Sequence, residues 1–304
     1  MRQLLRGLPL LLLLAFASAG DSASAALRVV CGSSVVYDLT RQIGAGRIAV
    51  SSLIPPGADP HTYQPRPDDA KALAGADLVV INGLGFEGWW EKLATEASFP
   101  AAKVVVAAAR VKPLPMGDAP GHEGHGHAPN EPDPHAFGDV ANAVRYAEAI
   151  RDGLIRADPA GEGHYRAMAE LLIAELRALD AWTKRTLATI PARRRVVITN
   201  HDAMQYFARA YGFTVKAPNT ALEDSQPSAK QIADLVAFIR AEGVAGVFIE
   251  AAKNRKVVEQ IAAEAGVRVG GALHLDGIPP ADHLHTGYRG MVVSNVLALV
   301  EGLR

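Results

Sequence analysis

"GEGHYRAMAELLIAELRALDAWTKRTLAT", residues 161–189, is the longest stretch of the chain with one uninterrupted helical period. Its apolar residues recur at spacings of three and four: Tyr165, Met168, Leu172, Leu176 and Leu179. This spacing predicts an amphipathic α-helix. At 1.5 Å per residue the helix is roughly 40 Å long, which is more than one small lobe requires. The stretch therefore predicts a long helix that joins two parts of the protein, and Pro191 ends it.

Short apolar, β-branched runs alternate with helical stretches on both sides of this helix. The runs lie at 27–31, 48–54, 77–83 and 103–109 before it, and at 194–200, 213–217, 244–250 and 267–273 after it. Such alternation indicates parallel sheets. We predict an α/β fold of two similar α/β lobes with parallel-rich sheets, joined by one long rigid α-helix. The expected boundaries are 26–158 for the N-terminal lobe, 159–190 for the linking helix and 191–304 for the C-terminal lobe.

The first 25 residues read as a secretory signal peptide, because two arginines precede a short apolar run and small residues follow it. Cleavage after residue 19 or residue 25 fits the pattern of small residues. The only cysteine, Cys31, lies in a predicted buried strand and lacks the context of a lipid-anchored cysteine. We therefore expect a periplasmic monomer that is not lipid-anchored. A net charge of −1 with mixed charges argues against a nucleic-acid partner.

Four residues of types that bind metals stand in predicted loops next to strand ends: His61, His135, His201 and Asp276. Ligands of α/β sheets gather at such ends. His61 and His135 each follow an acid and a proline, in "DPH". The acids, Asp59 and Asp133, could accept the other imidazole N–H and orient each ring from outside the ligand set. Each histidine alone could be an ordinary loop residue, so the hypothesis rests on their joint placement.

These segments carry a resemblance. "PPGADPHTYQPRPDD", "NGLGFEGWW", "EPDPHAF", "TNHDAMQYFARAYG" and "GALHLDGI" occur in this order. The chain resembles the zinc/manganese-binding solute-binding proteins of ABC importers, cluster A-I. The resemblance implies a metal site in the cleft between the lobes, with His61 and His135 from the first lobe and His201 and Asp276 from the second. It also implies high-affinity binding of Zn²⁺ in the periplasm and its delivery to an ABC-type membrane permease.

The donor set favours zinc, because three imidazoles and one carboxylate suit four-coordinate Zn²⁺. Manganese prefers more oxygen ligands and binds such sites more weakly. Manganese-selective members of the resembled family often carry a glutamate where this chain has His201. A manganese or mixed-metal binding protein is the alternative. Water could replace Asp276 in the fourth position, and three further histidines could compete with it: His274, His283 and His285.

A histidine-rich loop is predicted at 118–129, where His122, His125 and His127 lie among glycines and prolines. Such tracts bind metals loosely. The loop either collects zinc for the cleft or is a polar loop with incidental affinity. A periplasmic zinc metallochaperone is a further partner that the sequence leaves open.

Two enzyme-like interpretations are weaker. A zinc hydrolase with three histidines and a water would need a general base, and Asp59 or Glu250 could be imagined in that role. No H-E-x-x-H motif supports it, so we predict that the chain is not an enzyme. "GLGFEG" at 83–88 matches G-x-G-x-x-G, but the acidic residue expected about twenty positions later is absent.

Overall fold

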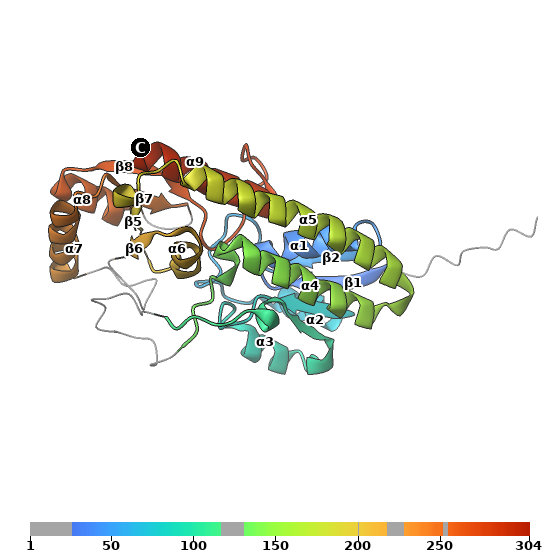
Figure 1. The fold of residues 1–304 in the computed structure, drawn as a ribbon. Helices are drawn as coiled ribbons and strands as arrows, with labels where there is room; N and C mark the ends of the chain where they lie inside the picture. The colour runs from blue at the N-terminus through green and yellow to red at the C-terminus, as the bar shows by residue number, and fades with distance from the viewer. Residues whose placement is uncertain (1–25, 117–130, 200, 218–227, 252–254) are drawn as a thin grey trace, which may run out of the picture.

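Four parallel strands form the sheet of the N-terminal part of the protein. The computed structural model describes residues 26–116, 131–199, 201–217, 228–251 and 255–304. The strands are β1 (Leu27–Cys31), β2 (Ile48–Ser52), β3 (Leu78–Ile81) and β4 (Val104–Val106), and they pair in the order β2-β1-β3-β4. Helices α1 (Ser34–Gly44), α2 (Pro67–Ala74), α3 (Trp90–Glu96) and α4 (Val140–Ala157) accompany this sheet (Figure 1). The predicted signal peptide, residues 1–25, lies outside the described residues.

Two parallel strand pairs form the C-terminal part. One pair is β5 (Val196–Ile198) with β6 (Thr214–Lys216), and the other is β7 (Gly246–Glu250) with β8 (Arg268–Leu273). Strand β5 lies beside β7. The helices of this part are α6 (Gln205–Tyr211), α7 (Ala229–Glu242), α8 (Arg255–Ala265) and α9 (Gly287–Leu303). A capping box begins α7, where the Ser228 hydroxyl accepts the backbone N–H of Gln231.

Helix α5 (Glu162–Leu187) runs along both parts of the molecule (Figure 1). Its buried stripe includes Tyr165, Leu172, Leu176 and Leu179, which confirms the predicted apolar face, while Met168 is half-buried. Helix α9 packs along it. One continuous hydrophobic core includes residues from β1, α4, α5, α6 and α9. The two parts therefore share a core through α5 and α9.

Helix α9 also bonds to the N-terminal part, although it comes last in the chain. The carboxylate of Asp38, in α1, accepts the backbone N–H of Tyr288. The Tyr288 hydroxyl donates to the carbonyl oxygen of Phe137 at 2.7 Å. These contacts tie the first turn of α9 to residues that precede α5.

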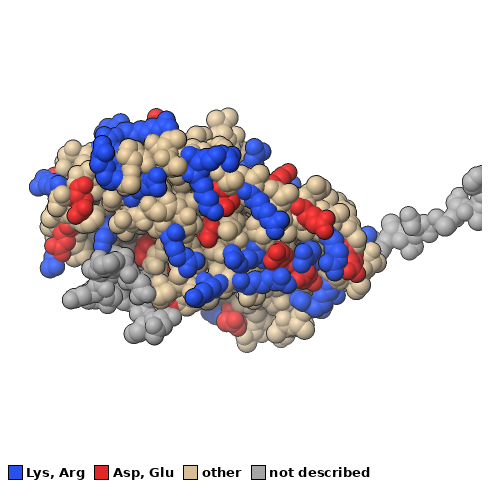
Figure 2. Space-filling view, viewed as in Figure 1, with Lys and Arg blue, Asp and Glu red and all other residues tan. Residues whose placement is uncertain are grey.

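The described surface carries mixed charges. Figure 2 shows basic and acidic side chains interspersed on the face in view. Among the described residues, no helix combines the length and the apolar character that crossing a membrane requires.

Gly83 and Gly85, in the GLGFEG stretch, have φ of 84° and 82°. That backbone region favours glycine, so the two glycines form the turn after β3.

Candidate metal centre

Loops that follow strands carry three of the four predicted ligands, whereas the fourth, His135, precedes a helix and follows no described strand directly. His61 lies in the loop after β2, and His201 lies three residues after the end of β5. Asp276 lies three residues after the end of β8. His135 stands directly before a short 3₁₀ turn, Ala136–Gly138, that leads into α4. Because parallel strands point their carboxyl ends the same way, their loops bring these distant residues together.

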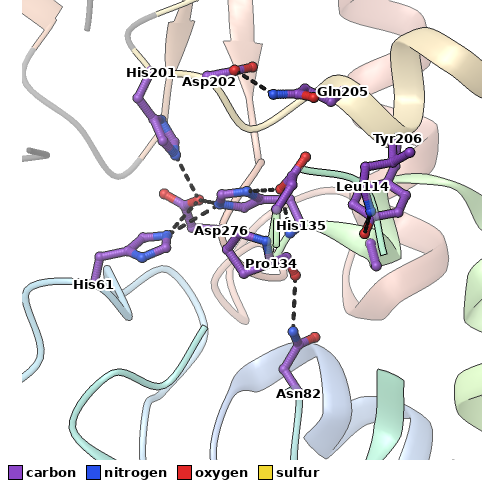
Figure 3. Close-up of polar contacts among 12 residues, drawn as sticks. His61, Asn82, Leu114, Pro134, His135, His201, Asp202, Gln205, Tyr206 and Asp276 are labelled. Atoms are coloured by element: carbon purple, nitrogen blue, oxygen red, sulfur yellow. Dashed lines mark hydrogen bonds and ion pairs between the residues drawn. The ribbon is translucent and has the colours of Figure 1, made fainter. Parts of the chain in front are cut away.

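The four side chains converge on one point, as Figure 3 shows. The Nε2 atoms of His61, His135 and His201 lie 3.4, 3.3 and 3.3 Å from Asp276 Oδ1. The Nε2 atoms of His61 and His135 are 3.3 Å apart. Ligands bound at about 2.0–2.1 Å to a tetrahedral ion are separated by about 3.3–3.4 Å. Four of the six distances among these donor atoms therefore match a tetrahedral coordination sphere, and all four atoms lie within 4.8 Å of one another.

The site is largely closed to water. His135, His201 and Asp276 are 1%, 7% and 5% exposed, and His61 is half-buried. The ring of Phe86 packs edge-on against the rings of His61 and His135. Little room remains at the buried ligands for the several waters that an oxygen-preferring ion would retain.

Carboxylates behind two of the imidazoles fix the tautomers. Asp133 Oδ1 accepts both the backbone N–H and the Nδ1–H of His135, each at 2.8 Å. The Glu250 carboxylate does the same for His201, accepting its backbone N–H at 2.8 Å and its Nδ1–H through the other oxygen. An imidazole that donates through Nδ1 presents a lone pair at Nε2. Both Nε2 lone pairs then face the Asp276 carboxylate, an arrangement that calls for a cation.

Burial and the neighbouring charges also shift the pKa values of the four predicted ligands. Burial lowers the pKa of His135, but its bonds to Asp133 and Asp276 outweigh burial and raise the pKa to about 9. For His201, burial is likewise outweighed by Glu250 and Asp276, and the pKa rises well above its ordinary value. Burial lowers the pKa of His61. Burial alone would raise the pKa of Asp276, yet the histidines hold it well below the ordinary value. The site therefore attracts protons when it has no metal.

Asp59 and Asp133 have different contacts. Asp133 bonds the ring of His135, as expected, whereas Asp59 Oδ1 accepts the backbone N–H of His61 at 3.0 Å. Sequence reasoning did not find the contact of Glu250 with His201. Glu250 ends β7, which lies beside the strand that leads to His201, and this adjacency comes from the tertiary fold.

A polar network lies behind His135. The Asn82 amide donates to the carbonyl oxygen of Pro134 at 3.0 Å (Figure 3). The Asn82 side-chain oxygen accepts from the Tyr146 hydroxyl at 2.9 Å. Sequence reasoning did not identify Asn82. The three histidines of the 118–129 loop, His122, His125 and His127, lie outside the described residues.

Comparison with known proteins gives a consistent family. The family model described as periplasmic zinc-uptake complex component A matches residues 29–302. The manganese-binding lipoprotein MntA of Halalkalibacterium halodurans is 30% identical over 277 residues, covering 91% of this chain and 88% of that protein. The iron-binding protein YfeA of Yersinia pestis is 31% identical over 251 residues, covering 83% and 78%. Further relatives are also named for manganese.

A solved structure agrees. The periplasmic zinc binding protein TroA of Treponema pallidum superposes with a TM-score of 0.81 at 29% identity, covering 91% of this chain and 99% of that one. The predicted α/β fold is thereby confirmed. Several relatives are named lipoproteins, which conflicts with the expectation of a protein without a lipid anchor. Cys31 is fully buried in β1.

Proposed function

Because this chain belongs to the family of periplasmic zinc-uptake component A proteins, we propose that its His61, His135, His201 and Asp276 bind one Zn²⁺ as cargo. Membership of this family supports a less specific description of the function. The chain is an extracytoplasmic, metal-binding solute-binding protein of an ABC transporter, it is not an enzyme, and it works with a membrane permease.

One observation carries the assignment of the four ligands. Three imidazole Nε2 atoms surround Asp276 Oδ1 at 3.3–3.4 Å. Two of these imidazoles donate through Nδ1 to a buried carboxylate, as metal-bound histidines usually do. Asp276 completes a set of four donors, so the proposal gives it the fourth position in place of water.

Zinc is supported by the donors and by their burial. Three nitrogens and one oxygen at tetrahedral separations suit Zn²⁺, which binds such sites more tightly than Mn²⁺ does. A six-coordinate Mn²⁺ would need two more oxygen donors beside ligands that are almost entirely buried.

Manganese is the second candidate, and the relatives favour it. The curated relatives described above are named for manganese or iron, not for zinc. The order of affinities decides which ion wins at equal concentration, whereas the cell's supply of each free ion decides the cargo. A manganese importer could therefore use this site where free zinc is scarce.

The deciding experiment titrates the metal-stripped protein with Zn²⁺ and with Mn²⁺ in competition with a chelator. His201→Ala and Asp276→Ala are measured alongside. We expect one tightly bound Zn²⁺ that is lost in His201→Ala and weakened in Asp276→Ala, and much weaker binding of Mn²⁺. Mn²⁺ binding as tight as that of Zn²⁺ would favour the second candidate. Zinc affinity indifferent to Asp276 would contradict the four-ligand site.

The monomeric state, a metallochaperone partner, the signal peptide and the metal-collecting role of the 118–129 loop stay predictions. For the loop, the matching test is deletion of 118–129 followed by zinc affinity, stoichiometry and the rate of transfer from a zinc donor. Unchanged values in all three would exclude a role in collecting zinc.

A further inference from the structure

A second group of histidines lies just beyond Asp276. His274 follows β8 directly, two residues before Asp276, and His283 and His285 lie in the loop that leads into α9. The ring centres of His274 and His283 are 5.0 Å apart, and those of His283 and His285 are 6.2 Å apart. Neither His274 nor His283 belongs to the four-residue cluster around Asp276.

The metal centre itself supplies a scale for this spacing. The ring centres of His61, His135 and His201 are 5.3, 5.4 and 5.9 Å apart in pairs. Two imidazoles that share one tetrahedral ion at about 2.0–2.1 Å have ring centres roughly 5 Å apart. The distance of 5.0 Å between His274 and His283 meets that requirement.

The backbone orients the ring of His283. Its Nδ1 lies 2.9 Å from the carbonyl oxygen of His285. The backbone N–H of His285 lies on the same side, 3.1 Å from Nδ1. In the tautomer with the proton on Nδ1, this atom donates to the carbonyl oxygen and Nε2 carries the lone pair that a metal ion needs. The ring of His283 is thus oriented by the chain itself, as the rings of His135 and His201 are oriented by carboxylates.

The loop that carries His283 is fastened near its start and within its course. The backbone N–H of Ile278 donates to the Ser34 hydroxyl at 3.2 Å, and the Ile278 carbonyl accepts the N–H of Gly57 at 3.1 Å. The N–H of His283 donates to the carbonyl oxygen of Pro280 at 3.0 Å. A ligand held in this way loses little freedom when an ion binds.

Exposure distinguishes this pair from the metal centre. His274 is 9% exposed, but His283 is half-buried and its neighbour Leu284 is 89% exposed. An ion at the pair would therefore be open to water on one side. Imidazole ligands alone suit Zn²⁺, Cu²⁺ or Ni²⁺, whereas Mn²⁺ prefers oxygen ligands.

We propose that His274 and His283 form a second, water-exposed site for an imidazole-preferring divalent ion such as Zn²⁺, with water completing its coordination. This second site is additional to the cargo site at Asp276. Its place on the same segment as Asp276, and its exposure, make it a staging position for an ion that enters or leaves the cleft.

The test counts zinc equivalents in a background that lacks the other histidine tract, with His122, His125 and His127 each changed to Asn. Zn²⁺ is titrated against a chromophoric chelator of moderate affinity. We expect one tight and one weaker equivalent in this background, and only the tight one in His283→Asn, whose side-chain oxygen can still accept the N–H of His285. The matched control is His164→Asn on α5, which keeps both equivalents. Mn²⁺ yields no second equivalent.

A zinc-edge anomalous map of crystals of the unsubstituted protein locates the ion independently of any variant. A peak between the rings of His274 and His283 supports the proposal. A map with a peak only at Asp276, or a His283→Asn protein that retains both equivalents, overturns it. The tight equivalent reports the cargo site separately, so failure of the two sites can be told apart.

Discussion

Changing Glu250 to Gln tests how the metal centre depends on an outer carboxylate. Glu250 is 2% exposed and uses one oxygen for the backbone N–H of His201 and the other for its Nδ1–H. A glutamine has one oxygen and one NH₂ group. If the NH₂ faces Nδ1, His201 must carry its proton on Nε2 and loses the lone pair that binds metal. If the NH₂ faces the backbone, two N–H groups oppose each other in a buried place.

Either orientation weakens metal binding. Removal of such an outer partner typically lowers metal affinity by about 10–100-fold, which corresponds to roughly 1.4–2.7 kcal/mol. Because the Glu250 carboxylate accepts two hydrogen bonds from the same residue, we expect a loss near the upper end. The expected loss of affinity rests on the buried Glu250 carboxylate that holds the ring of His201.

The assay is competition for Zn²⁺ between the metal-stripped variant and a chelator of known affinity, at one fixed pH. The matched control is Glu242→Gln, at the exposed end of α7, which removes the same charge far from any ligand contact that the structure describes. A Glu250→Gln affinity within twofold of the control would refute the reasoning, because His201 would then not depend on its carboxylate.

Three further predictions concern Asp276, the histidine ligands and the buried Glu87. Asp276→Asn, which keeps the shape but removes the charge among three imidazoles, should lower zinc affinity more than Glu250→Gln does in the same competition assay. Zinc affinity should rise with pH up to about 9, because the raised pKa values of His135 (about 9) and His201 make protons compete with the metal. Affinity measured from pH 6 to 9 checks this, and a plateau above pH 7 would contradict it. Burial raises the pKa of Glu87 to about 7, above its unfolded value near 4.3, so its contribution favours folding below pH 4 and is lost as the pH rises through 7. Denaturant unfolding of the metal-free protein should show this decline between about pH 4.3 and 7, and Glu87→Gln should decline less over that range. Above about pH 6.5 both proteins should lose stability further, because the pKa values of His135 and His201 are raised.

Helices were easier to predict from the sequence than strands. The apolar spacing predicts helices at 34–44, 140–157 and 287–303, which are the bounds of α1, α4 and α9. Helix α5 begins and ends within two residues of the predicted 161–189. Their periodicity extends over many residues and their caps are local, as at Asp139, whose side chain accepts the N–H of Ala141. Strand ends depend on pairing with distant segments. The run at 103–109 therefore contributes only Val104–Val106 to the sheet, and a 3₁₀ turn begins at Ala107.

The residues of the metal centre also differ in how well the sequence predicts them. The four predicted ligands could be selected from their residue types and their places at strand ends, and the structure brings them together. Asp133 could be found because the "DPH" triplet is local. Glu250 and Asn82 could not, because each reaches its partner across a gap of about fifty residues in the chain. No local pattern encodes these contacts. The contact of Glu250 depends on β7 lying beside β5, and that of Asn82 on the turn after β3 meeting the segment before α4.

The contacts of Asp276 also limit how the cleft can open. Two residues after Asp276, Ile278 is bonded to Ser34 and Gly57, both of the N-terminal part. The first turn of α9 is bonded to Asp38 and Phe137, and the shared core continues through α5 and α9. A wide rotation of the two parts would break these bonds and expose apolar core, whereas a local movement of the loop that carries His201 would leave them intact. Since both Asp276 and α9 are fastened to the N-terminal part, metal exchange is expected to proceed by local loop movement around a rigid frame.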